Sequence, residues 1–196
     1  MRIPNEKRTV IVLGERFQPE QLEQLLVHHG WKRIASESTG EGGRQITEQI
    51  WSNDDHTKAV HFIDDRTMRT RYLWVRGQEI ISIASLLVGH LHVHPADELL
   101  SDVADAETTV ELEQALLHLA VGSRGPLDGD ALETFRHFAP DPRHSVRYTV
   151  IQSLLFTGWP QGHEILEEMK AREADRDLRE FASEAAQALA EGNAGP

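Results

Sequence analysis

The chain has 196 residues, with 20 Lys and Arg against 32 Asp and Glu, and a formal net charge of -12. This length suits one large domain or two small ones, and a composition of 39% hydrophobic and 27% charged residues excludes wholesale disorder and a membrane bundle. The absence of Cys excludes disulfides, zinc ribbons and thiol nucleophiles, and the excess of acid disfavours nucleic-acid binding. No apolar run is long enough for a signal peptide or a membrane span, so we expect a cytoplasmic protein.

The first half of the chain predicts an antiparallel sheet with two helices. A β-branched apolar run at 9–13 predicts a first strand, and leucines on one face before Gly30 predict a helix over 18–29. A nearly all-apolar helix over 79–91 completes this α+β module, which we expect to span residues 1–100. Between the helices, turn clusters separate four strand-like runs, 31–38, 45–52, 57–63 and 71–75. Such short connections permit only antiparallel neighbours, because a parallel return needs a long crossover.

Three histidines at alternate positions, His90, His92 and His94, are the sharpest local motif for chemistry. On a strand they would face one side, as paired metal ligands do. The preceding helix is predicted to end within this segment, which would separate the three rings, and His is common at the negative end of a helix. We therefore expect no metal site, and metal binding through these residues stays an alternative.

The second half of the chain predicts only helices. From residue 105 onward the apolar residues recur every three or four positions, which indicates five helices of about 12 to 15 residues. The breaks between them are short and contain Gly, Pro or Asp, at 122–126, 140–142, 158–160 and 172–175. Breaks of this length force neighbouring helices to run antiparallel. Residues 101–196 are thus predicted to form helical hairpins, and the fold class of the whole chain is α+β.

Two helix starts in this half are alike. Residues 141–147 and 173–179 each begin with an acidic residue and end with an apolar residue followed by Arg, at an offset of 32 residues. A fainter copy at 105–111 has Glu in place of the Arg. This pattern resembles HEAT repeats, including the subset named after phycobilisome lyases, over about residues 105–190.

The resemblance implies that the hairpins stack and that Asp and Arg side chains of successive turns form pairs. We therefore expect Arg147 and Arg179 to be structural residues. Each guanidinium is expected to reach an Asp or a helix-end carbonyl near the start of a neighbouring helix, and Asp141 and Asp175 are the candidate acceptors.

Motifs for catalysis are missing from the sequence. No Ser lies in a nucleophile elbow, and His163-Glu164 is not part of a His-Glu-x-x-His helix. We therefore expect a protein that is not an enzyme, holds no cofactor and offers an acidic helical-repeat surface to a protein partner. The acidic charge suits a basic partner.

Trp159, in the turn 158–160 between two predicted helices, is the candidate contact residue, since large aromatic side chains on loops often anchor a partner. Packing of its indole over the end of the hairpin is the alternative.

Two other functions stay open. One is an immunity- or antitoxin-like protein that neutralises a basic partner, and the other is a lyase for a small ligand or chromophore, which the resemblance to phycobilisome lyases implies.

Overall fold

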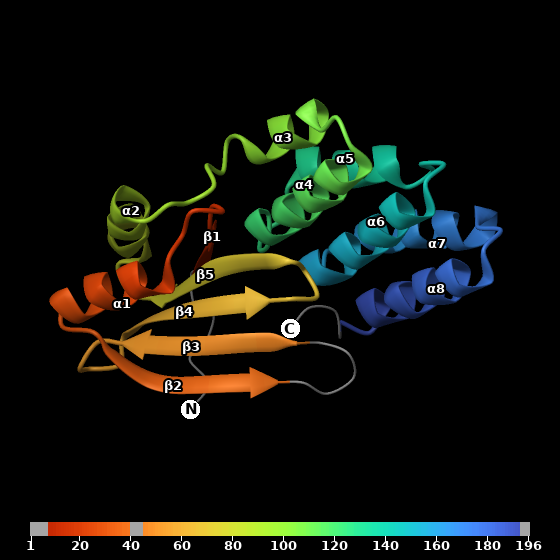
Figure 1. Cartoon of the computed structure of the whole chain (residues 1–196). Coiled ribbons are helices and arrows are strands. Elements are labelled where there is room, and N and C mark those ends of the chain that lie inside the picture. The colour runs from red at the N-terminus through yellow and green to blue at the C-terminus, as the bar shows by residue number, and fades with distance from the viewer. Residues whose placement is uncertain (1–7, 40–44, 193–196) are drawn as a thin grey trace. The chain divides into compact units, whose positions relative to one another are not determined.

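The computed structural model describes residues 8–39 and 45–192 (Figure 1). The chain divides into two compact units, Met1–Ala96 and Asp97–Pro196, which we call the sheet unit and the helical unit. The predicted α+β class is confirmed, because an antiparallel sheet precedes a part built from helices. Within the described residues no helix is both long and apolar enough to cross a bilayer.

The described residues of the sheet unit contain one antiparallel sheet with the strand order β1-β5-β4-β3-β2. Strands β2 to β5 follow one another as hairpins, and β1 pairs with β5 at the far side. The predicted antiparallel pairing is therefore confirmed. The strand bounds are Arg8–Val12 (β1), Lys32–Thr39 (β2), Ile46–Ser52 (β3), Lys58–Asp65 (β4) and Thr70–Gly77 (β5).

Local contacts at both ends of β5 hold its position against β4. The buried Asp65 carboxylate accepts hydrogen bonds from the backbone N–H groups of Thr67 and Met68 at 2.9 and 3.0 Å, which fixes the turn into β5. At the other end, Gly77 has a φ of 101°, and a Cβ there would lie 2.1 Å from the backbone oxygen of Thr57. Only glycine fits this position without a shift of the backbone.

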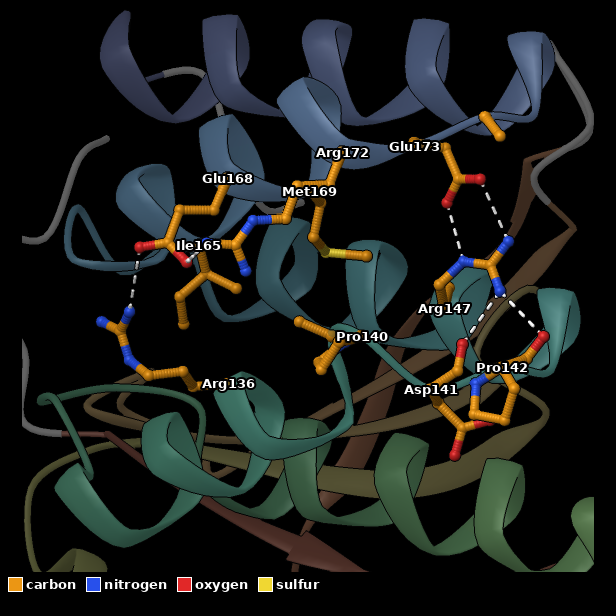
Figure 2. Close-up of a pocket in the computed structure, with 12 residues that line it drawn as sticks. Arg136, Pro140, Asp141, Pro142, Arg147, Ile165, Glu168, Met169, Arg172 and Glu173 are labelled. Atoms are coloured by element: carbon orange, nitrogen blue, oxygen red, sulfur yellow. Dashed lines mark hydrogen bonds and ion pairs between the residues drawn. The ribbon is translucent and has the colours of Figure 1, made fainter.

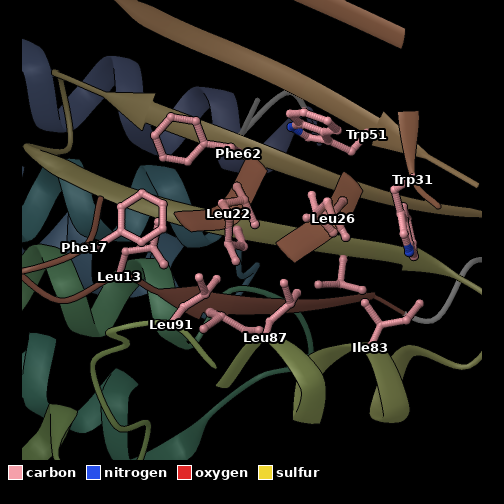
Figure 3. Packing of buried hydrophobic residues seen from close by; sticks show 14 residues of the cluster. Leu13, Phe17, Leu22, Leu26, Trp31, Trp51, Phe62, Ile83, Leu87 and Leu91 are labelled. Atoms are coloured by element: carbon pink, nitrogen blue, oxygen red, sulfur yellow. The ribbon is translucent and has the colours of Figure 1, made fainter. Parts of the chain in front are cut away.

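Two helices, α1 (Pro19–His28) and α2 (Ile80–His90), pack on one face of the sheet. Strand alternation places Leu73 and Val75 of β5 on this face. Each fully buried aliphatic side chain contributes about 1.5 to 3 kcal/mol. Figure 3 shows this core, whose buried members are Ile11, Leu13, Phe17, Leu22, Leu26, Trp31, Trp51, Val60, Phe62, Leu73, Val75, Ile83, Leu87 and Leu91.

The described residues of the helical unit form six helices. The five helices predicted after residue 105 are confirmed, and residues 105–190, all of which the structure describes, contain no strand. The short helix α3 precedes them and was not expected from the sequence. The bounds are Leu99–Asp105 (α3), Thr109–Gly122 (α4), Gly129–Phe138 (α5), His144–Thr157 (α6), Gly162–Arg172 (α7) and Arg176–Ala190 (α8).

Within the helical unit, α4, α6 and α8 form a row with α6 in the middle, and each contacts the helix that precedes it in the chain (Figure 1). Val150 and Leu154 of α6 have no exposed surface, because this helix has neighbours on both sides. The N-terminal N–H groups of α4, α5 and α8 donate to the side chains of Thr108, Asp128 and Asp175. The unit is therefore a stack of capped helical hairpins.

Candidate functional site

Arg147 of α6 and Arg179 of α8 make the same backbone contact one hairpin apart. Nη1 of Arg147 donates to the carbonyl oxygen of Asp141 at 2.9 Å, and Nη1 of Arg179 donates to that of Glu173 at 2.9 Å. Each acceptor lies six residues before its arginine. The two arginines, 32 residues apart in the sequence, therefore make equivalent contacts in successive hairpins. In both hairpins the guanidinium satisfies a carbonyl of the loop that enters the helix.

The carboxylate that binds Arg147 belongs to Glu173, in the turn between α7 and α8 of the next hairpin. Nε of Arg147 donates to Oε2 at 2.7 Å and Nη2 donates to Oε1 at 3.0 Å, and the two side chains are 18% and 6% exposed. A bidentate pair with this little exposure is stronger than an ion pair in open solvent. The hydrogen bonds from Arg147 hold the pKa of Glu173 below its ordinary value.

Asp141 accepts from Arg147 through its backbone carbonyl, one of the two kinds of contact that we expect, but the carboxylate that Arg147 contacts is that of Glu173, and the carbonyl that Arg179 contacts is also that of Glu173. The Asp141 side chain accepts from Nε and Nη2 of Arg143, two residues away, at 2.9 and 2.8 Å. The Asp175 side chain accepts from the backbone N–H of Leu178 at 3.0 Å and so caps α8. The Asp175 side chain also lies 3.7 Å from Nε2 of His144, but the longer Glu173 is the residue whose carboxylate reaches Arg147 in the preceding hairpin.

Arg147 and Glu173 lie at one end of a groove of about 490 Å³ between α5 and α7, which we call the α5–α7 groove (Figure 2). Its lining also includes Arg136, Glu168 and Arg172. Nη1 of Arg136 lies 3.7 Å from Oε1 of Glu168, and Nη2 of Arg172 lies 3.9 Å from Oε2 of the same residue. Each arginine of this groove therefore faces a carboxylate, and the charges of the groove neutralise one another.

A second groove, of about 500 Å³, lies between α3 and α5, and we call it the α3–α5 groove. Leu100 and Val103 of α3 and Phe138 of α5 give it an apolar surface. Asp130 and Glu133 of α5 add two carboxylates to its lining. None of the described residues that line it is Lys or Arg, so this groove is negative where the α5–α7 groove is neutral.

The net charge is divided unequally between the two units. The helical unit has 20 Asp and Glu against 8 Lys and Arg, a net charge of -12, whereas the sheet unit has 12 of each. Residues 77–123 contain no Lys or Arg. The excess of acid is therefore strongest on α3 and on the start of α4. The acidic residues there are Asp97, Glu98, Asp102, Asp105, Glu107, Glu111 and Glu113.

Of the three candidate metal ligands, only His90 lies on a helix, and His92 and His94 lie in the connection that follows it. His90 is the last residue of α2. The backbone of the next two histidines bonds to the segment around the end of β1: the N–H of Gly14 donates to the oxygen of His92 at 3.0 Å, and the N–H of His94 donates to the oxygen of Val12 at 2.9 Å. In the part of the chain that the structure describes, no three His, Asp or Glu side chains are grouped to hold a metal ion.

Trp159 is buried between α6 and α7 and is only 3% exposed. Its Nε1 donates to the carbonyl oxygen of Gly125 at 3.1 Å, and its ring centroid lies 6.4 Å from that of Phe135. The predicted contact role is therefore corrected: the indole packs over the end of the hairpin and closes the core there.

A buried histidine on the sheet was missed by the sequence analysis. His61 of β4 is 4% exposed, and its Nδ1 lies 2.6 Å from Oε1 of Glu48 on β3. This contact lowers the pKa of Glu48, because the carboxylate accepts a hydrogen bond from the ring. Alternation along β3 places Glu48 on the face away from α1 and α2, but only the register between the strands shows that His61 is its partner.

Comparison of the chain with protein-family models, with curated proteins and with solved structures gives no match. The function is therefore inferred from the residues of this chain alone.

Proposed function

We propose that this chain is a non-catalytic protein-binding module whose acidic helical unit takes a basic protein partner. One observation carries the proposal: the whole net charge of -12 belongs to the helical unit, while the sheet unit is neutral. A surface with one sign of charge accelerates association with an oppositely charged partner and rejects like-charged ones. The same field repels the phosphates of nucleic acids.

The arginines of the helical unit cancel only part of this charge, although Arg143 reaches the start of α4, where its Nη1 donates to Oγ1 of Thr109 at 3.3 Å. Arg136 and Arg147 face carboxylates in the α5–α7 groove, and Nε of Arg176 lies 2.8 Å from Oε1 of Glu180 on α8. No Lys or Arg occurs in residues 77–123. A partner that supplies Lys and Arg side chains to α3 and α4 would therefore meet an excess of carboxylates there.

We further assign the helices of this unit to the HEAT-like class of hairpins. The support is the repeated hydrogen bond of Arg147 and Arg179 to a carbonyl six residues earlier, together with the row formed by α4, α6 and α8. Arrays of this class use their extended surfaces to bind proteins. The assignment thus agrees with a role in binding.

The proposal is tested by capture of the partner and by charge removal. The full chain is immobilised, exposed to a lysate of its native host at low salt, and the retained protein is identified by mass spectrometry, purified and titrated back. Three exposed carboxylates are removed in the variant Asp97→Asn, Asp105→Asn, Glu107→Gln. The matched control, Glu20→Gln, Glu23→Gln, Glu37→Gln, removes the same charge from the sheet unit.

We expect a basic partner whose Kd rises about tenfold with the helical variant, because three exposed charges at about 0.5 kcal/mol each amount to one order of magnitude. The control should bind within about twofold of the wild type, and the Kd should rise steeply with salt. If no purified protein rebinds, or if both variants bind as the wild type does, the proposed function is wrong.

A further inference from the structure

The α3–α5 groove has apolar side chains that are exposed to solvent. Leu99 and Val103 of α3 are 4% and 5% exposed, because they face the interior of the helical unit. Leu100, one position on from Leu99, is 38% exposed and lines the groove together with the half-buried Phe138 of α5. The volume of about 500 Å³ lies within the range of about 300 to 1,000 Å³ that binding pockets have.

The carboxylates of this groove point to the chemistry of its occupant. Asp130 and Glu133 are both exposed and line the groove from α5, and α3 carries Asp102 and Asp105. No Lys or Arg is among the described lining residues, and the cation nearest to these carboxylates is Arg136, whose Nε lies 3.5 Å from Oε1 of the exposed Glu133. An occupant with positive charge would therefore complement the groove, whereas an acidic one would be repelled by it.

The neighbouring α5–α7 groove supplies an internal comparison. It is of similar volume, but its arginines face Glu168 and Glu173 of the chain itself. A basic ligand would have to displace Arg136 or Arg147 from these carboxylates. The α3–α5 groove has one weaker contact of this kind, because Nε of Arg136 lies 3.5 Å from Oε1 of Glu133, and its lining contains no Lys or Arg among the described residues.

We propose that the α3–α5 groove binds a basic amphipathic helix of the partner protein. This inference rests on the proposed function and adds the place and the chemistry of the contact. Apolar side chains at three- and four-residue spacing on that helix pack on Leu100 and Phe138, and flanking Lys or Arg side chains lie at Asp130 and Glu133. A helix between two helices is a common mode of peptide recognition, in which apolar anchors fill the groove and charges set the orientation.

The test uses a displayed library of random peptides of about 15 residues, which is four helical turns. The library is selected on the full chain, and enriched peptides are synthesised, labelled and titrated by fluorescence anisotropy. Two variants remove features of the groove: Leu100→Ala, and Asp130→Asn with Glu133→Gln. The matched control, Glu164→Gln with Glu168→Gln, removes two carboxylates that contact Arg136 on the other side of α5. Circular dichroism checks that every variant is folded.

We expect enriched peptides with a positive net charge and apolar residues at helical spacing. Their Kd should rise about tenfold with the double carboxylate variant and about fivefold with Leu100→Ala, and should stay within about twofold with the control. Enrichment of acidic or proline-rich peptides, equal loss in the control, or no enrichment would overturn the inference.

A further arm separates this inference from the proposed function. The partner captured from the host is titrated against Asp130→Asn with Glu133→Gln. Weaker binding supports both statements. If the partner binds this variant as tightly as the wild type but loses affinity for the Asp97, Asp105 and Glu107 variant, the groove is wrong and the proposed function stands.

Discussion

The α5–α7 groove and the α3–α5 groove share α5 as one wall and have similar volumes, about 490 and 500 Å³, but they use charge in opposite ways. In the first, Arg147 and Glu173 join two hairpins through a bidentate pair. In the second, Asp130 and Glu133 lie beside an apolar surface with no Lys or Arg among the described lining residues. The comparison teaches that the charges of one stack can form a close, nearly buried pair at one groove and lie exposed, with only the 3.5 Å contact of Glu133 to Arg136, at the next.

The largest effect on stability is expected from removing Arg147, whose ion pair joins the two hairpins. Arg147→Ala leaves the nearly buried Glu173 without its partner and also frees the carbonyl of Asp141, so unfolding should cost about 2 to 4 kcal/mol less. Arg172→Ala, whose side chain is 76% exposed, should change stability by less than about 0.5 kcal/mol. Chemical denaturation of both variants measures the difference. Equal and negligible shifts would show that the Arg147 pair does not join the hairpins.

Measuring the free energy of unfolding at several pH values tests whether the Glu173 carboxylate supplies this stability. Because Arg147 lowers the pKa of Glu173 in the folded state, the pair stabilises the fold above the unfolded pKa of about 4.3. That stability is lost as the pH falls through the folded pKa. The difference in unfolding free energy between the wild type and Arg147→Ala should therefore shrink between about pH 6 and about pH 2.5. A difference that stays constant would assign the effect to packing of the Arg stem.

The third prediction separates the carboxylate from the backbone contact. Arg179 repeats the hydrogen bond of Arg147 to a carbonyl, but its side chain is exposed. Arg179→Ala should therefore cost about 1 kcal/mol, the usual value of one hydrogen bond. Denaturation under the conditions used for Arg147→Ala gives the comparison. A loss as large as that of Arg147→Ala would mean that the backbone bond, and not Glu173, supplies most of the stability.

The smallest effect belongs to the groove that we assign to binding. Asp130→Asn with Glu133→Gln removes exposed charges, one of which forms only a 3.5 Å ion pair with Arg136. The unfolding free energy should change by less than about 0.5 kcal/mol in either direction. The melting temperature of the variant checks this value. A clear loss of stability would show that these carboxylates hold the fold together, as their counterparts in the α5–α7 groove do.

Much of the fold follows from the periodicity of the sequence. Strands joined by Asn- and Asp-rich turns and helices with apolar residues every three or four positions were placed close to their observed bounds. Helix α3 was missed because it has only seven residues, of which Leu99 and Val103 are buried, and two side chains do not establish a period. The α3–α5 groove depends on this helix and was therefore missed as well.

The site residues show where local patterns stop being informative. The offset between 141–147 and 173–179 singled out Arg147 and Arg179, but the choice of acceptor depended on side-chain length and on competing donors. The Asp141 carboxylate accepts hydrogen bonds from Arg143, and the longer Glu173 side chain accepts from Arg147. Such choices are made by packing between hairpins, which no spacing in the sequence encodes.

The most direct test of these proposals compares the dissociation constants of two variants for the purified partner. One variant is Asp130→Asn with Glu133→Gln in the α3–α5 groove, and the other is Glu164→Gln with Glu168→Gln on α7. Both remove two negative charges from the same unit, so a general effect of charge acts equally on them. We predict that the first weakens the partner about tenfold and the second by less than about twofold. Equal Kd values for the two variants would contradict the claim that the two grooves use their charges differently.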